Sequence, residues 1–189
     1  MKRPDKEAID RYLAERAQAP YTYAEVSATR NESRIRVVAD RYRVQRLRVR
    51  LGAGAESFAA ACDALWQGSM FPAPQIELHP SGASLEVGSV VGVLAHTGPL
   101  WSLHPSRVIY TIREERRVGF AYGTLPGHAL RGEERFLVEW TAPDEDVIFE
   151  LLSFSRPAAW WARLTAPCVR RSQRRFADRS CASMIEATT

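Results

Sequence analysis

GFAYGTLPGHALRGEERFLVEW, residues 119–140, decides the fold, because it predicts two β-strands joined by one loop. Large apolar residues alternate with small or polar ones over Val118–Thr124 and again over Glu133–Thr141, which is typical of strands with one buried face. The Leu125–Gly132 loop between them contains a proline and two glycines, which favour turns. A connection this short predicts that the two strands are antiparallel neighbours.

The same pattern extends to both sides of this stretch. Further strands are predicted at Tyr42–Leu51, Gln75–His79, Gly88–His96, Ser106–Arg113 and Val147–Phe154. We expect the segment from Thr97 to Pro105 to be a loop. Consecutive strands joined by short turns predict an antiparallel meander.

Helical periodicity is found near the two ends and once between the first strands. Pro4–Ala17 predicts a short amphipathic helix, and Ala55–Gln67 predicts a helix with one buried stripe, whereas Tyr21–Arg34 is polar and irregular. The chain closes with a helix predicted from about Pro157 to Ile185, which Pro167 should kink or divide. A helical projection groups Val169, Phe176, Ala177, Ser180 and Met184 on one side, with Arg170, Arg171, Arg174, Arg175 and Arg179 around the rest.

These elements predict an α+β fold in which a curved antiparallel sheet of about seven strands wraps around a long C-terminal helix. The helix needs an apolar surface to pack on, and the sheet is the only large one available. This order resembles the helix-grip fold of START-like lipid-transfer and aromatase/cyclase domains. We expect residues 1–20 to form a helical extension and residues 21–189 a single START-like domain.

Four stretches resemble one family. They are YAEVSATR (residues 23–30), MFP (70–72), the Gly119–Trp140 block, and FSRPAAWWARL (154–164) followed by VRRSQRRF (169–176). With these, the chain is similar to the bacterial and plant family known as domain of unknown function nineteen-ninety. The resemblance covers nearly the whole chain after about Pro20. It implies a START-like fold and implies little about activity, because the family carries no settled reaction.

Charge is distributed unevenly along the chain. The net charge is only +4, but residues 1–50 carry +6, residues 51–155 carry −7 and residues 156–189 carry +5. Basic ends around an acidic middle are typical of elements that pair in the fold. A basic helix for a nucleic acid or another polyanion is the alternative, and the absence of a recognition module speaks against nucleic acid.

The sequence excludes several other classes. Three cysteines without a CxxC pattern indicate reduced thiols, and the start of the chain lacks the apolar region of a signal peptide. The longest apolar stretch, around Val87–Ala95, is too short to span a bilayer. The four histidines show neither HxH nor HExxH spacing, so we predict no metal site and no cofactor. The expectation is a cytoplasmic monomer.

The loop Tyr122–His128 and the strand after it hold the densest set of potentially functional groups. Strand alternation places Glu134, Phe136, Val138 and Trp140 on one face and Glu133, Arg135, Leu137 and Glu139 on the other. Because the first set is more apolar, Glu134 is predicted at the mouth of an apolar interior, where desolvation raises a carboxyl pKa. The alternative is a Glu134 that pairs with an arginine of the last helix or with loop backbone. His128 is either a base at the pocket edge or a loop imidazole in solvent.

Aromatic side chains on the strands complete the predicted ligand site. Its residues are Tyr110, Phe120, Tyr122, His128, Glu134, Phe136 and Trp140. Aromatic residues line small-molecule cavities, although they also fill ordinary cores.

Three functions follow from this site and from the basic helix. The first is binding of a small hydrophobic molecule, of lipid, isoprenoid or aromatic polyketide type, between the sheet and the C-terminal helix. The second is an enzyme of the cyclase, hydrolase or isomerase type, with Glu134 and His128 as its acid and base. The third is an interaction protein that uses its arginine-rich helix. No residue is assigned as catalytic under the first function.

Overall fold

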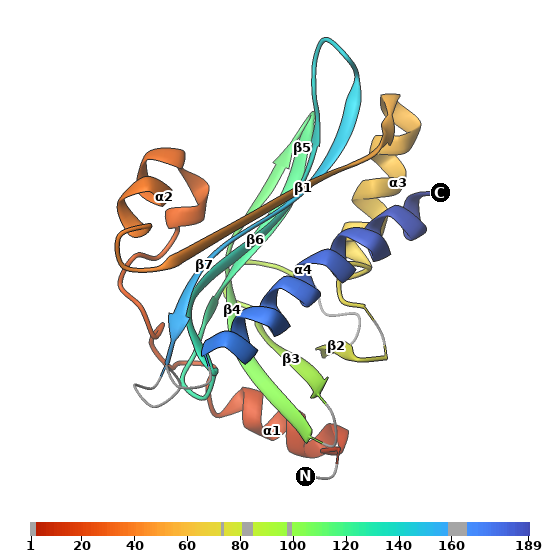
Figure 1. Ribbon diagram of the computed structural model, residues 1–189. Coiled ribbons are helices and arrows are strands. Elements are labelled where there is room, and N and C mark those ends of the chain that lie inside the picture. The colour runs from red at the N-terminus through yellow and green to blue at the C-terminus, as the bar shows by residue number, and fades with distance from the viewer. Residues whose placement is uncertain (1–2, 73, 81–84, 98–99, 159–165) are drawn as a thin grey trace.

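Seven antiparallel strands form one sheet in the order β1-β7-β6-β5-β4-β3-β2 (Figure 1). This computed structural model describes residues 3–72, 74–80, 85–97, 100–158 and 166–189. The strands are β1 (Arg43–Ala53), β2 (Ile76–His79), β3 (Val90–Thr97), β4 (Leu100–Glu114), β5 (Arg117–Thr124), β6 (Leu130–Trp140) and β7 (Asp146–Pro157). The helices are α1 (Lys6–Ala14), the 3-10 turn η1 (Ala28–Arg30), α2 (Glu32–Val38), α3 (Gly54–Trp66) and α4 (Ala166–Thr188).

One face of the sheet, the inner face, is covered by α3 and α4, and Figure 1 shows α4 crossing it diagonally. Apolar residues at alternate strand positions form the main core there with the two helices. These include Val108, Phe120, Phe136, Phe149 and Leu151 from the strands, Leu65 from α3, and Ala177 and Met184 from α4. The predicted helix-grip fold is therefore confirmed.

The other face, the outer face, is covered by the N-terminal part of the chain. Ile9 and Leu13 of α1 pack on Leu94 of β3, because these two residues lie one helical turn apart. The segment from Tyr21 to Tyr42, which contains η1 and α2, packs on Leu152 and Phe154 of β7. Both faces of the sheet are thus buried over much of their area.

Two predicted boundaries are wrong. The segment Thr97–Pro105 was expected to be a loop, but β4 begins at Leu100 and pairs with β3 along this stretch. Pro105 lacks a backbone donor and so argues against a central strand. It is tolerated here because β5 pairs with β4 only from Ser106 onward. No strand residue described on that side therefore needs a hydrogen bond from the backbone nitrogen of Pro105.

The C-terminal helix also begins later than expected. Pro157 ends β7, where it pairs with Leu130, and α4 starts at Ala166. Pro167 therefore lies in the first turn of α4, where the backbone N–H has no acceptor within the helix, and it does not interrupt the helix. Trp160 and Trp161 fall outside the described residues, as do the side chains of residues 166–170.

The segment expected to be irregular, Tyr21–Arg34, ends within the first turn of the short helix α2, which sequence analysis did not predict. Asn31 caps it by accepting a hydrogen bond from Ser33 N at 2.8 Å, and Ile35 and Val38 are buried beneath it. The helix has only seven residues, and three of them are β-branched, which lowers intrinsic helix propensity. Packing of Ile35 and Val38 on the sheet is what stabilises it.

The uneven distribution of charge is explained by ion pairs at the N-terminal end. Arginines of the first 50 residues form ion pairs with carboxylates of the acidic middle. These pairs are Arg3–Glu77, Arg46–Glu150, Arg48–Glu139 and Arg50–Asp146. Pairing within the fold is therefore confirmed for the N-terminal third.

The arginines of α4 are arranged differently. The side chains of Arg171, Arg174, Arg175 and Arg179 are exposed, and no carboxylate among the described residues lies within 4.0 Å of them.

Candidate functional site

A cavity of about 270 Å³ lies between the inner face of the sheet and the N-terminal half of α4. Apolar side chains of four elements line it, namely Ile76 of β2, Val93 and Ala95 of β3, Leu130 of β6 and Phe176 of α4. Polar side chains also reach it, namely Gln45, Ser102, His104, Tyr122, His128, Glu134, Ser153, Ser172 and Gln173. The lining therefore combines apolar side chains with convergent polar groups, and both kinds of group are found in small-molecule sites.

Glu134 and Tyr122 form the central polar pair of this cavity. They lie directly opposite each other on β6 and β5, so their side chains project from the same face. Tyr122 Oη donates a hydrogen bond of 2.6 Å to Glu134 Oε2. Burial raises the pKa of Glu134 to about 7, and the hydrogen bond from Tyr122 opposes this rise only in part.

The structure gives Glu134 a partner that neither of the two alternatives named. Among the described residues its partner is Tyr122 rather than an arginine of α4 or the loop backbone. Burial also raises the pKa of Tyr122, and the neighbouring carboxylate adds to this rise, so the phenol stays protonated and remains a donor. Near neutral pH the pair can therefore exist with Glu134 either charged or neutral.

His128 lies at the same cavity and is not the solvent-exposed imidazole that loop position favours. Leu130 N–H donates to His128 Nδ1 at 2.9 Å, so a neutral ring carries its proton on Nε2. The ring of His104 on β4 lies 4.9 Å from it, centroid to centroid. Burial, together with this second imidazole, lowers the pKa of His128 to about 3. At neutral pH His128 is therefore an uncharged donor through Nε2–H.

The loop that carries His128 is held from the outer face. Arg16, at the end of α1, donates from Nε to Pro126 O at 2.9 Å. At the start of the loop, Thr124 Oγ1 lies 2.6 Å from Thr22 Oγ1 and accepts a hydrogen bond from Gly132 N at 3.0 Å. Residues of the N-terminal segment thereby hold the start of the loop, and Thr124 joins the start to Gly132 at its end.

Gly132 has a specific reason to be glycine. Its φ is +152°, and a Cβ atom at this position would collide with the carbonyl oxygen of Phe154 on β7. The close approach of the two backbones brings β6 against β7 where the loop meets the cavity. A smaller hollow of about 60 Å³ lies beside Gly132, Ser155 and Gln173 and shares Glu134 with the main cavity. Its volume is enough for a few water molecules.

The other predicted site residues are placed differently. Phe120 and Phe136 lie on the inner face, but both are fully buried in the core. Trp140 packs at the edge of that core against Phe58, with ring centroids 5.7 Å apart. None of these three lines the cavity.

Tyr110 is on the wrong face for the predicted site. A β-bulge between Val108 and Tyr110 shifts the register of β4, so Val108 is opposite Tyr122 while Tyr110 is opposite Ala121. The extra residue reverses the alternation, and Tyr110 points to the outer face. There its hydroxyl lies 2.7 Å from Thr29 Oγ1.

Of the fifteen residues that line the cavity, the sequence-based prediction contained only Tyr122, His128 and Glu134; the twelve that it lacked include Gln45, His104, Ser153 and Gln173. Ser153 could have been found, because alternation places it on the same face as Val147, Phe149 and Leu151. His104 could not, because its strand was expected to be a loop.

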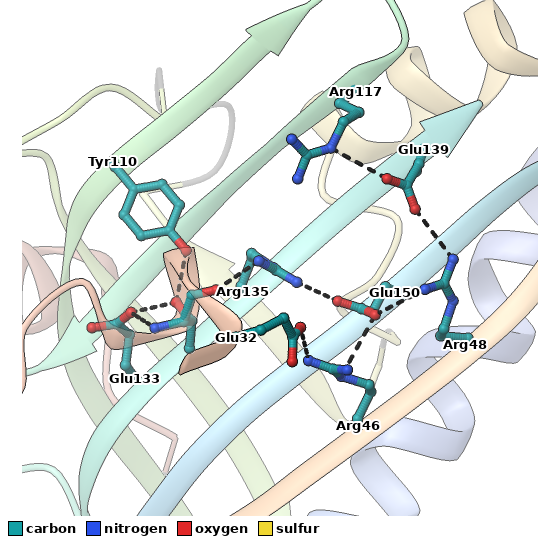
Figure 2. A network of polar contacts seen from close by, with 10 residues as sticks. Glu32, Arg46, Arg48, Tyr110, Arg117, Glu133, Arg135, Glu139 and Glu150 are labelled. Atoms are coloured by element: carbon teal, nitrogen blue, oxygen red, sulfur yellow. Dashed lines mark hydrogen bonds and ion pairs between the residues drawn. The ribbon is translucent and has the colours of Figure 1, made fainter. Parts of the chain in front are cut away.

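The outer face carries a buried polar network that strand alternation did not reveal (Figure 2). Glu133 is only 3% exposed and accepts hydrogen bonds from Tyr23 Oη at 2.9 Å, Ser27 N at 2.7 Å and Thr29 N at 2.9 Å. Arg135, 6% exposed, donates to Thr29 O at 2.6 Å and forms an ion pair with Glu150. These contacts attach the N-terminal segment to the sheet.

Two further features concern only the described part of the chain. There, no cluster of three or more histidines, cysteines or carboxylates could hold a metal ion. No helix in those ranges is long and apolar enough to cross a membrane.

Cys62 and Cys181 are free thiols, and burial raises the pKa of both.

Solved structures with the same fold include enzymes. The chain is similar to an aromatase/cyclase from a Streptomyces species, with a TM-score of 0.53 and 14% identity over 78% of this chain and 93% of that one. It is also similar to norcoclaurine synthase from Thalictrum flavum, with a TM-score of 0.51 and 11% identity over 78% and 97%. At these identities the likeness shows the START/Bet v1-like fold alone.

Sequence relatives come from distant organisms. A UPF0548 protein of Dictyostelium discoideum is 30% identical over 202 residues, covering 98% of this chain and 94% of that protein. A UPF0548 protein of Deinococcus radiodurans is 40% identical over 152 residues, covering 75% and 76%. Residues 22–183 match the family model described as "Domain of unknown function (DUF1990)". The cavity and the polar network described above are therefore those of a member of the DUF1990 family, to which this chain belongs.

Proposed function

We propose that this protein binds a small hydrophobic molecule that carries one polar group, in the cavity between the sheet and α4. The apolar lining from Ile76, Val93, Leu130 and Phe176 supplies the favourable free energy of burial. A volume of about 270 Å³ is near the lower end of the range for small-molecule sites. This size suits one or two fused rings or a short isoprenoid or acyl chain better than a two-chain phospholipid.

The observation that carries this proposal is the Tyr122–Glu134 pair. A carboxyl group that is removed from water costs free energy unless its hydrogen-bonding capacity is used. Tyr122 uses one oxygen, and among the described residues Glu134 Oε1 has no partner. Such a group beside apolar side chains is suited to orienting a ligand.

The first test is to identify what the purified protein already carries. Native mass spectrometry should show an adduct of a few hundred daltons, which organic extraction would release for identification. For the ligand-free protein, the neutral fluorophore N-phenylnaphthylamine should bind with enhanced emission. A protein that carries no adduct and does not bind this fluorophore or a panel of lipids and aromatics would contradict the proposal.

A matched pair of variants on α4 tests whether binding occurs in the cavity. Ser172 lines the cavity, so Ser172→Trp should fill part of it and weaken fluorophore binding by at least about tenfold. Ala182 lies on the same helix and is exposed, as Ser172 is, but it does not line the cavity, so Ala182→Trp should leave binding unchanged. Equal effects of the two substitutions would show that the fluorophore binds elsewhere.

An enzyme is the second candidate, and one observation favours it. Glu134, with a pKa of about 7, lines the same cavity as His128, which presents Nε2–H. A carboxyl group that titrates near neutral pH is suited to general acid–base catalysis. Extracted molecules should then change mass when they are incubated with fresh protein, and Glu134→Gln should abolish the change. A binding protein would leave their masses unchanged.

A further inference from the structure

The charge of the cavity lining is negative or zero. Among the described residues it contains one carboxylate, Glu134, and neither lysine nor arginine. The chain has 24 arginines, so this absence is not a matter of composition. Arg46 and Arg48 of β1 lie on the outer face, where they pair with Glu150. Arg43, at the start of β1, shares the face of Gln45, but it is exposed and does not line the cavity. The arginines of α4 from Arg171 onward are exposed.

The two histidines do not supply a positive charge either. Protonation of His128 requires a proton on Nδ1, which accepts the hydrogen bond from Leu130 N–H. That bond would have to break, and the imidazole of His104 lies close enough to oppose a second charge. The pKa values of both rings are lowered by burial, that of His128 to about 3.

The polar groups that the surrounding elements contribute to the cavity lining with Glu134 include, among the described residues, none that is charged at neutral pH. They include Tyr122 on β5, Ser153 on β7, Gln45 on β1, His104 on β4, His128 in the loop and Gln173 on α4. Gln173 Nε2 donates to Ser155 Oγ at 2.8 Å. Among these residues, Tyr122 is the only hydrogen-bond donor to Glu134. A charged Glu134 therefore has one oxygen without a protein donor, and no counter-ion, in the described lining.

We propose that the cavity selects hydrophobic amines over hydrophobic carboxylates, with the Glu134 carboxylate as the partner of the ligand ammonium group. This inference rests on the proposed function and names its ligand class. An ammonium group supplies both the missing positive charge and the missing donors. A ligand carboxylate would place a second negative charge beside Glu134 and would find no basic side chain in the described lining.

Proton linkage follows from the same pairing. An ammonium group binds the ionised form of Glu134, so the amine affinity rises with pH up to about 7 and is constant above it. At about pH 6, where Glu134 is mostly protonated, binding of one amine should release nearly one proton. A neutral alcohol of the same chain length should show neither effect.

Three ligands of equal chain length test the inference: octylamine, octanol and octanoate, each as a competitor of N-phenylnaphthylamine at about pH 7.5. We expect octylamine to bind at least about tenfold more tightly than octanoate, with octanol between them. Proton release is measured by titration calorimetry in two buffers with different ionisation enthalpies.

Two Glu→Gln variants of β6 provide the control. Glu134→Gln should abolish the preference for octylamine and its proton release while octanol still binds. Glu139→Gln changes the same charge on the same strand, but Glu139 pairs with Arg48 and Arg117 on the outer face, so the preference should remain.

The outcomes separate this inference from the proposed function. Binding of octanol together with octanoate binding as tight as that of octylamine would overturn the amine selectivity and leave the binding function standing. If neither the fluorophore nor any of the three ligands binds, the binding function itself fails.

Discussion

Glu133 and Glu134 are consecutive residues of β6, yet their carboxylates lie on opposite faces of the sheet and have different hydrogen-bonding environments. Glu133 accepts bonds from Tyr23 Oη and from two backbone N–H groups of the N-terminal segment. Glu134 accepts, among the described residues, only from Tyr122. The carboxylate of Glu133 connects the N-terminal segment to the sheet. The carboxylate of Glu134 faces a cavity and, within the described part of the chain, has one oxygen free to accept further hydrogen bonds from a ligand.

The same substitution at these two positions should therefore have different effects on stability. Glu133→Gln places an amide NH₂ group against N–H donors and should lower the free energy of unfolding by about 2–3 kcal/mol. Glu134→Gln should not lower it at neutral pH, because a neutral amide is readily accommodated at the cavity wall, where burial disfavours the ionised carboxylate. Urea unfolding followed by tryptophan fluorescence measures both. Equal losses would contradict the structural role assigned to Glu133.

The pH dependence of stability should carry the signature of Glu134. Its pKa is about 7 in the folded protein and 4.5 as the reference value, so the folded state binds more protons between these two values. Its contribution to stability is therefore full below about pH 4.5, falls as the pH rises to about 7, and is constant above that. The difference between the unfolding free energies of wild type and Glu134→Gln should show this decline. A flat difference would contradict the raised pKa.

His128 should produce the opposite slope. Its pKa is about 3 when folded against a reference of 6.5, so the unfolded state binds the extra proton between these values. Stability from His128 is complete above about pH 6.5 and is lost as the pH falls toward 3. In His128→Asn, whose side-chain oxygen can still accept from Leu130 N–H, this acid sensitivity should disappear. The imidazole proton resonances of His128 should also stay constant between about pH 5 and 8.

The buried ion pair of the outer face can be tested by a double-mutant cycle. Arg135 and Glu150 are 6% and 4% exposed and pair with each other. Glu150→Leu removes the carboxylate from a buried guanidinium group and should cost about 3–5 kcal/mol. Arg135→Met combined with Glu150→Leu removes both charges and should recover most of this loss. A double variant as unstable as Glu150→Leu would show that the pair is not the source of the effect.

The fold could be predicted because the determining signals are local. Alternation over Val118–Thr124 and Glu133–Thr141 predicts the central strands β5 and β6 to within a few residues. Their antiparallel pairing could be predicted because a short loop joins them. The faces of β6 were also assigned correctly, since Glu134 and Glu133 are indeed on opposite sides. Alternation alone does not indicate what covers the second face.

The errors concern features that depend on distant residues. The bulge in β4 that turns Tyr110 to the outer face has no recognisable pattern in the sequence. Helix α2 forms because Ile35 and Val38 pack against the sheet. Phe120 and Phe136 were placed on the correct face, but whether an aromatic residue lines a cavity or fills the core depends on the helix opposite. The network around Glu133 joins residues more than 100 positions apart.

Tyr122 should influence the titration of Glu134, and a substitution of Tyr110 serves as the control experiment. The hydrogen bond from Tyr122 lowers the pKa of Glu134, so Tyr122→Phe should raise it above its value of about 7. The decline of stability would then extend to higher pH, and octylamine would bind more weakly at neutral pH than it does to wild type. Carbon NMR of the Glu134 carboxyl group measures the change directly. Tyr110→Phe removes a hydroxyl that lies on the outer face beside Thr29, so it should leave this titration unchanged. If both variants shift the titration alike, the hydroxyl of Tyr122 is not the group that sets the ionisation of Glu134.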